Sequence, residues 1–102
     1  NIVAKVGGIG MGIYGVRWAR DPQPPSAETV AEFWRDEVRF VLDTFGPDRC
    51  MAESNFPVDL NCMSYGTLWD AMRIMVGHLD TAEQALFFSG TACEVYRLDI
   101  EI

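Results

Sequence analysis

The sequence predicts an α/β fold built on a parallel sheet, and three observations carry that prediction. Two short, mostly apolar runs, residues 2–6 and 49–53, have the composition of buried strands. A long amphipathic segment separates them, and further helical segments follow the second run. Strands that alternate with helices pair in parallel through right-handed crossovers, so the two runs should lie side by side. Two strands cannot form a sheet covered on both faces, so this architecture is incomplete.

The first strand is expected over residues 2–6, where β-branched residues dominate and Gly7 and Gly8 end the run. Residues 7–25 hold five glycines and then three prolines, which predicts a long loop. Loops longer than about 12–15 residues in compact domains are usually functional.

A helix of about five turns is expected after this loop. Ser26 supplies an N-cap behind Pro25, and Glu28 complements the positive end of the helix dipole. Gly46 and Pro47 end the helix. Its apolar residues recur at helical spacing and form one stripe: Val30, Phe33, Trp34, Val38, Val41, Leu42 and Phe45.

Three helices are expected after the second strand at residues 49–53. Ser64 caps the first of them, which should end near His78. Thr81 and Thr91 each begin a capping-box pattern, so two short helices should follow, separated at Gly90.

Composition limits the function classes. A chain of 102 residues that is 49% hydrophobic and 23% charged fits one globular domain, residues 1–102, and excludes intrinsic disorder. The net charge of −7 opposes binding to nucleic acid or anionic lipid, and no run is apolar for long enough to span a membrane. The chain begins at Asn1 without an initiator Met, so we expect the natural start to lie elsewhere.

The cysteine and histidine content argues against a disulfide framework and against a metal site within this chain. The three cysteines form no C-x-x-C pair, which makes a reducing cytoplasm the simplest location. With His78 as the one histidine, no spacing of metal ligands is present.

Residues 10–15, GMGIYG, match the G-x-G-x-x-G pattern of dinucleotide-binding loops. In those loops a helix opens within the motif, so that its first amides hold the pyrophosphate. Here no helix is expected before Ser26. A glycine-rich loop without a nucleotide is therefore the better interpretation.

Residues 45–59, FGPDRCMAESNFPVD, and residues 88–98, FSGTACEVYRL, are more specific. Together they resemble the end of the amidohydrolase-related, metal-dependent hydrolases of TIM-barrel fold. In that family an FGPDR turn leads into the eighth strand, a GSDWP-like motif ends it, and a final helix reads like GTNAARLYRL. Residues 3–8, VAKVGG, resemble the seventh strand, VKLSG. The resemblance covers nearly the whole chain in the right order.

The resemblance implies a larger architecture than the residues alone. Residues 1–102 would be the C-terminal βα units, strands 7 and 8 with their helices, of a single (β/α)8 TIM-barrel domain. A TIM barrel takes roughly 250 residues, so the chain would be an incomplete barrel.

The strand-8 aspartate of the family is a metal ligand or proton-transfer group, and Asn55 occupies its position here. A neutral amide cannot act as a carboxylate base and is a weaker oxygen ligand, so metal use is open. Glu53 lies two residues earlier and points to the same side of the strand. It either replaces the missing carboxylate as a catalytic group or pairs with Arg49 or with a cation on the neighbouring strand.

Three further residues are candidates for binding substrate. Lys5 lies one residue from the end of an apolar strand and needs a partner, either an anionic substrate group or an acidic neighbour. Arg17, with Tyr14 beside it, lies on the loop that would overhang the same site and could bind a carboxylate through two hydrogen bonds. Solvent-exposed side chains on a variable loop are the alternative.

The expected function is therefore part of an amidohydrolase-like hydrolase, or decarboxylase, acting on a small carboxylate-bearing substrate. The resemblance allows a divalent, zinc-like metal in the full-length enzyme, held by residues outside this segment, and the segment alone should be inactive. Its partners would be the small-molecule substrate, the rest of the barrel and, if the enzyme is a homo-oligomer, further copies. The competing hypothesis is a self-contained acidic α/β protein-interaction module without catalysis.

Overall fold

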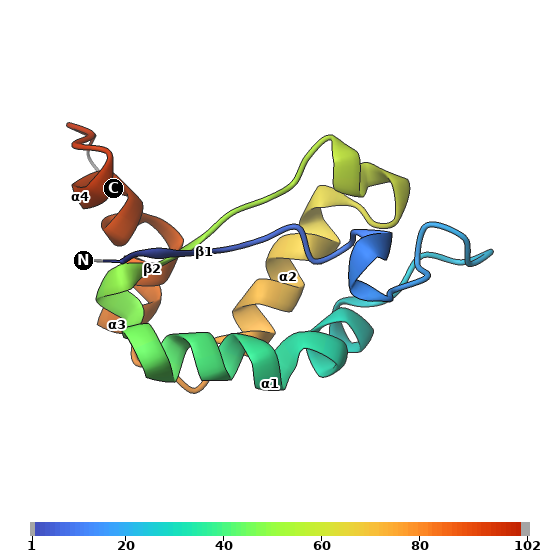
Figure 1. Cartoon of the computed structure of the whole chain (residues 1–102), viewed down its shortest axis with the longest axis horizontal. Coiled ribbons are helices and arrows are strands. Elements are labelled where there is room, and N and C mark those ends of the chain that lie inside the picture. Colours follow the sequence, from blue (N-terminus) through green and yellow to red (C-terminus); the bar gives the residue numbers. More distant parts are fainter. Residues whose placement is uncertain (1, 101–102) are drawn as a thin grey trace.

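The structure, a computed structural model, describes residues 2–100. Asn1, which bears on the expected natural start, and residues 101–102 lie outside the described part. Within residues 2–100, two short strands and four α-helices follow one another in the order β1, α1, β2, α2, α3, α4 (Figure 1). Their bounds are Ala4–Val6 (β1), Ala27–Phe45 (α1), Cys50–Ala52 (β2), Tyr65–Met75 (α2), Thr81–Ala85 (α3) and Thr91–Val95 (α4).

The two strands pair in parallel, as the sequence predicts. Ala4 lies opposite Cys50 and Val6 opposite Ala52. Each strand is shorter than the expected residues 2–6 and 49–53, because Arg49 belongs to the 3-10 turn Pro47–Arg49 and two short strands support few ladder hydrogen bonds. The resulting α/β unit has a two-stranded sheet.

The long helix is confirmed at both ends. The Ser26 hydroxyl accepts a hydrogen bond from the Thr29 amide at 3.1 Å, and Gly46 ends α1 with a φ of 83°. The buried stripe of α1, which includes Val30 and Leu42, packs against α2.

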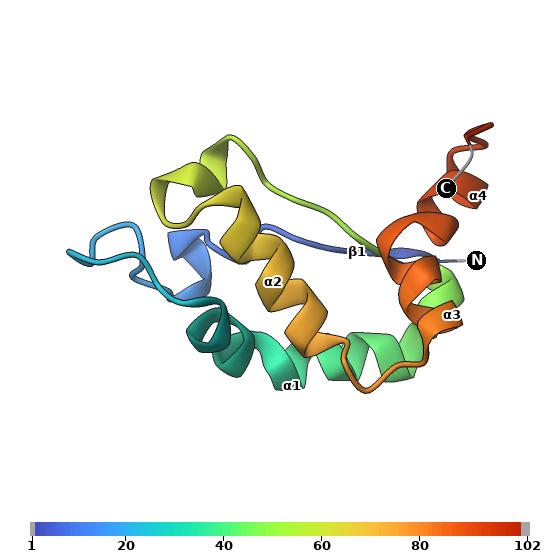
Figure 2. The ribbon, with the colours of Figure 1, turned by 180° about the vertical axis from the view of Figure 1, so that it is seen from behind.

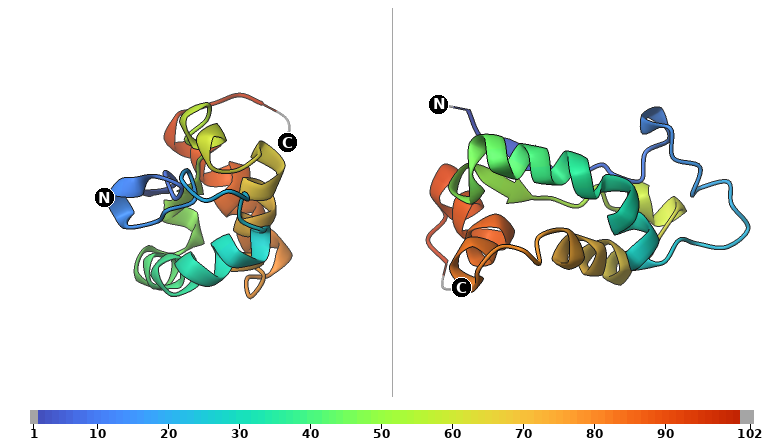
Figure 3. Two further views of the ribbon diagram at one scale, coloured as in Figure 1. Left: turned by 90° about the vertical axis from the view of Figure 1, so that its right-hand side faces the viewer. Right: turned by 90° about the horizontal axis from the view of Figure 1, so that it is seen from below.

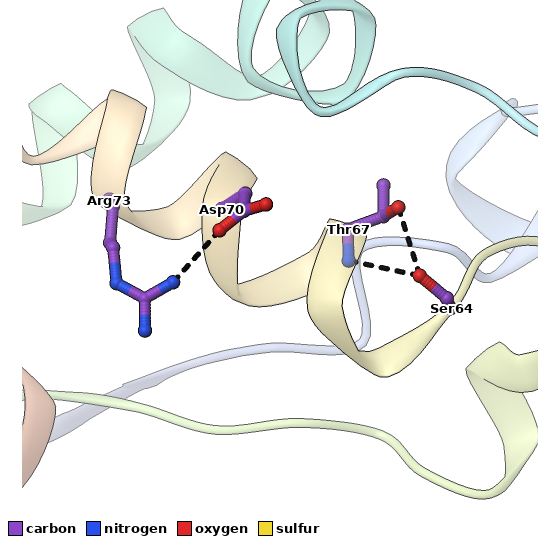
Figure 4. Close-up of polar contacts among 4 residues, drawn as sticks. All are labelled: Ser64, Thr67, Asp70 and Arg73. Carbon is purple, nitrogen blue, oxygen red and sulfur yellow. Dashed lines mark hydrogen bonds and ion pairs between the residues drawn. The ribbon is translucent and has the colours of Figure 1, made fainter.

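Helix α2 begins at its predicted cap, as Figure 4 shows. The Ser64 hydroxyl accepts a hydrogen bond from the Thr67 amide at 3.1 Å, and one turn later Asp70 pairs with Arg73 at 2.9 Å. The helix ends at Met75, before His78, because the chain turns at Val76 and Gly77.

We expect Ser64→Ala to lower the free energy of unfolding by about 1 kcal/mol, because the first turn of α2 loses the acceptor for one of its free amides. Ser64→Asp keeps an acceptor at the same position and should stay within about 0.5 kcal/mol of the parent. Urea denaturation measures both. A loss of equal size in the two variants would show that the cap contributes nothing.

The C-terminal helices differ from the prediction in two places. Asp80, not Thr81, caps α3: its carboxylate accepts from the Glu83 amide at 2.8 Å, and the Glu83 carboxylate accepts from the Asp80 amide at 3.0 Å. Nor does Gly90 break the helix, because it is helical and ends a π-helical segment, Leu86–Gly90, that runs directly into α4. The Thr91 hydroxyl is therefore no cap. It is buried and donates to the Pro47 carbonyl at 2.8 Å.

The core lies between the sheet and the helices. Helices α1 and α2 run beside each other below the strands, and the C-terminal helices pack against β2 (Figures 1 and 2). The loop that follows β1 projects from the end of the molecule opposite the C-terminal helices (Figure 3). Phe87 is fully buried, and three further aromatic side chains, Trp34, Trp69 and Phe88, pack partly buried against the same cluster. Among residues 2–100, no helix combines the length and the apolarity that crossing a membrane requires.

Candidate functional site

Lys5 and Glu53 meet where the parallel strands end. Side chains alternate along a strand, so Val6 and Ala52 face the core while Lys5 and Glu53 lie on the opposite face. The Lys5 ammonium is 2.9 Å from the Glu53 carboxylate. Of the two partners that the sequence allowed for Glu53, the structure selects the cation on the neighbouring strand and not Arg49.

Gly7 makes room for this pair. The Glu53 amide donates to the Val6 carbonyl at 2.9 Å, which brings the Glu53 side chain directly over Gly7. A Cβ atom at Gly7 would collide with the Cγ of Glu53. The glycine that ends β1 is therefore also the residue that lets the carboxylate reach Lys5.

The ion pair with Glu53 shifts the pKa of Lys5. The hydrogen bond and negative charge of Glu53 raise the pKa of Lys5 above its ordinary 10.5, with a smaller contribution from Tyr96. About half of the Lys5 side chain is exposed, so solvent screens the interaction.

This shift predicts a pH dependence. A raised cation pKa means that the folded state holds the Lys5 proton more tightly than the unfolded state does. The stabilisation is therefore complete below about pH 10 and is lost as pH rises through the raised pKa. We expect the melting-temperature difference between the parent protein and Lys5→Met to be constant from about pH 7 to 10 and to shrink above that range. A difference that does not change with alkaline pH would contradict the ion pair.

Asn55 lies on the segment after β2, where Asp59 holds it. The Asn55 side-chain amide donates to the Asp59 carboxylate at 3.2 Å, and the Asp59 backbone amide donates to the Asn55 carbonyl at 2.9 Å. Phe56 packs edge-on against Tyr65 of α2, with 5.1 Å between the ring centres. These contacts fix the loop that carries Asn55 onto the first turn of α2.

Asp59 is the residue that sequence reasoning missed. Its position after Pro57 is typical of a turn, and it does lie in the 3-10 turn Val58–Asn61, yet its side chain is 2% exposed. The apolar neighbours Val58 and Leu60 are the exposed ones. The hydropathy of these three residues predicts the opposite pattern of burial, and no signal in the sequence identifies the Asp59 carboxylate as buried.

Aromatic contacts hold the glycine-rich loop on α1. The Tyr14 ring packs edge-on against Trp34 at 5.5 Å, and the Trp34 indole N–H donates to the Ile9 carbonyl at 2.9 Å. Tyr14 and Lys5 line one groove of about 270 Å³ along β1 and α1. Within residues 10–15 the chain forms a 3-10 turn, Gly12–Tyr14, and the next α-helix begins at Ala27, so no α-helix opens within this motif.

Arg17 lies apart from that groove. With Arg20 it lines a second cavity of about 440 Å³, walled otherwise by small and apolar residues of the same loop. Among residues 2–100, no acidic side chain lines this cavity. The structure thus joins Lys5 to Glu53 and to the Tyr14 groove, and Asn55 to Asp59, but keeps Arg17 in a cavity of its own.

The side chains present do not make a metal centre by themselves. In the part of the chain that the structure describes, no three His, Cys, Asp or Glu side chains are placed to hold a metal ion. The thiols of Cys50 and Cys62 are buried, and burial raises the pKa of both. A raised pKa keeps them protonated, so neither is an activated nucleophile.

Comparison with known proteins identifies the family. The sequence model of the amidohydrolases matches residues 1–98. The chain belongs to the amidohydrolase family. Over 98 residues it is 31% identical to the uncharacterized protein y4mH of Sinorhizobium fredii (strain NBRC 101917 / NGR234), a match covering 96% of this chain and 29% of that protein.

Two crystal structures of an amidohydrolase from Burkholderia multivorans share this fold. Both align with a TM-score of 0.77 at 27% identity over 94% of this chain. One holds bound zinc and the other bound HEPES, and the alignment covers 32% and 31% of those chains. The amidohydrolase chain described here thus spans less than a third of each of these relatives.

Proposed function

We propose that this chain supplies strands 7 and 8 of a (β/α)8 TIM-barrel amidohydrolase and part of its active site. The observation that carries the proposal is the position of Lys5, Glu53 and Asn55, which all lie at or just beyond the carboxyl ends of two parallel strands. In TIM barrels that edge carries the active site. The short match to longer relatives supports the view that further strands complete the sheet.

Glu53 is the proposed acid/base group of this site. An ionised carboxylate can take a proton from attacking water and return it to the leaving group of an ester, lactone or amide. Lys5 pairs with the Glu53 carboxylate at 2.9 Å and holds it at the end of the two strands. Asn55 orients the water or the substrate through hydrogen bonds.

A divalent, zinc-like metal would have to be held mainly by residues outside this chain. The described residues do not form a ligand cluster, and Asn55 offers only a neutral oxygen. When bound, such a metal supplies a Lewis acid that polarises the substrate carbonyl or activates water.

The proposed substrate is small and carries a carboxylate. Although the chain has a net charge of −7, Arg17 and Arg20 line a cavity to which no acidic residue of the described part of the chain contributes. Guanidinium groups bind carboxylates with two parallel hydrogen bonds. The same substrate class fits hydrolysis and decarboxylation.

The test uses the longer protein that contains this chain, loaded with zinc. We expect it to hydrolyse small lactones or esters that bear a free carboxylate at least about tenfold faster than the matched methyl esters, since each lost charged contact is worth 1–3 kcal/mol. Arg17→Gln should reduce that preference. Release of carbon dioxide without hydrolysis would make the enzyme a decarboxylase, and equal rates on charged and neutral substrates would overturn the substrate proposal.

The interaction-module alternative is not favoured, because the family match spans nearly the whole chain. It predicts that the isolated 102-residue chain melts cooperatively and binds no hydrophobic dye. A barrel segment should bind dye and associate, because the far edges of β1 and β2 have no strand partner among residues 2–100. We further propose a cytoplasmic location, consistent with three free cysteines.

A further inference from the structure

Two hydrogen bonds of opposite direction join Asn55 to Asp59. The Asp59 backbone amide donates to the Asn55 carbonyl at 2.9 Å, and the Asn55 Nδ2 donates back to the Asp59 Oδ1 at 3.2 Å. The backbone bond closes the loop, so the side-chain bond is not needed to close it. The side-chain bond has another consequence, which is the orientation of the Asn55 amide.

An asparagine side chain presents a donor on one side and an acceptor on the other, and its partner decides which faces where. In the structure the Nδ2 group faces Asp59 and donates to its Oδ1 at 3.2 Å. The Asn55 Oδ1 is then the end left free, and no residue among 2–100 donates a hydrogen bond to it. Asn55 therefore presents an acceptor to its surroundings.

Several hydrogen bonds and close contacts hold Asp59 in place. Its backbone carbonyl accepts from the amides of Cys62 and Met63 at 3.0 and 3.1 Å and from the Cys62 thiol at 3.1 Å. On the other side, a Cβ atom at Gly10 would collide with the Cys62 sulfur and come within 3.1 Å of the Asp59 Oδ1. The loop after β1 thus packs directly on the carboxylate that holds Asn55.

The burial of Asp59 is not explained by stability. The side chain is 2% exposed, and its Oδ2 has no hydrogen-bond partner in the described part of the chain. A carboxylate buried for structural reasons normally has both oxygens satisfied, and an unsatisfied one destabilises the fold. A buried polar atom without a partner therefore calls for another explanation, such as a role at a site.

We propose that Asp59 is a positioning residue that fixes the Asn55 amide with its oxygen toward the active site, so that position 55 accepts a hydrogen bond from water or substrate. The expected effect of Asp59 on kcat rests on the proposed function. The orientation of the Asn55 amide does not depend on the proposed function. Asp59 acts through Asn55 and does not touch the reacting atoms.

The kinetic test is a double-mutant cycle in the longer, zinc-loaded protein, using the carboxylate-bearing lactones or esters above. Asp59→Asn replaces the carboxylate that accepts from the Asn55 amide, and Asn55→Asp brings two carboxyl groups together. Each variant should lower kcat about tenfold or more and change KM less. The swap N55D/D59N restores one carboxylate and one amide. It should regain at least about tenfold in kcat over the worse single variant, because the pair is coupled. Additive losses in the swap would overturn the proposal.

A second measurement needs no turnover. In the same protein labelled with ¹⁵N-asparagine, the Asn55 side-chain amide is identified by its loss in Asn55→Ala. We expect its two protons to be widely separated in shift and to exchange slowly with solvent, and Asp59→Ala to abolish both properties while leaving the melting profile cooperative. Unchanged amide signals in Asp59→Ala would refute the positioning role. If no substrate is turned over but these signals respond as expected, the proposed function fails and the positioning role stands.

Discussion

We expect Glu53→Gln to lower the turnover of the proposed longer hydrolase by about 10²–10⁴-fold, the range typical for loss of a general acid or base. Glutamine has nearly the same size and still accepts a hydrogen bond from Lys5, so the site keeps its shape. What it loses is the capacity to take and return a proton. Steady-state kinetics should show the loss in kcat more than in KM.

The matched control for this variant is Asp70→Asn. Asp70 forms an ion pair with Arg73 of the same 2.9 Å length, but on the exposed surface of α2. Turnover should stay within about twofold of the parent, since exposed pairs contribute little. If Glu53→Gln behaved like Asp70→Asn, Glu53 would be a structural partner of Lys5 and nothing more.

Phe87→Ala should lower the free energy of unfolding by about 3–5 kcal/mol. Phe87 is fully buried in the π-helical segment between α3 and α4, and its ring packs on Phe88 at 5.2 Å between ring centres. Truncation removes the ring from the cluster that joins β2 to the C-terminal helices and leaves a cavity. The shift of the urea midpoint at constant slope measures the loss.

Phe40→Ala is the control of the same residue type. Phe40 lies on α1 with 71% of its surface exposed, so its removal should change the free energy of unfolding by less than about 0.5 kcal/mol. A substantial loss at Phe40 would show that this side of α1 is covered in the longer protein. A loss below about 1 kcal/mol at Phe87 would contradict the described core.

The sequence alone was sufficient to predict those elements whose structure depends on one local pattern. The apolar stripe and Ser26 define α1, and Ser64 defines the start of α2, because a capping side chain acts within its own first turn. The parallel pairing of β1 and β2 followed from the order of elements. The Lys5–Glu53 pair was among the alternatives that strand alternation allowed.

The remaining features depend on contacts between distant segments. Thr91 fits a capping pattern, but its hydroxyl bonds to Pro47, which only the fold brings near. Asp80 and Thr81 could each cap α3. Asp80 is the cap in the structure, because it places Glu83 at the third helical position, from which the Glu83 carboxylate bonds back to the Asp80 amide. The burial of Asp59 depends on Gly10 from the preceding loop, so no pattern around Asp59 reveals it.

The crystal structure of the longer, zinc-loaded protein tests the central claim most directly. We expect β1 and β2 each to gain a parallel neighbour on the far edge, and the Glu53 carboxylate and Asn55 Oδ1 to face a closed cavity at the carboxyl ends of the strands. A structure in which β1 or β2 stays an edge strand, or in which Glu53 faces away from that cavity, would contradict the account.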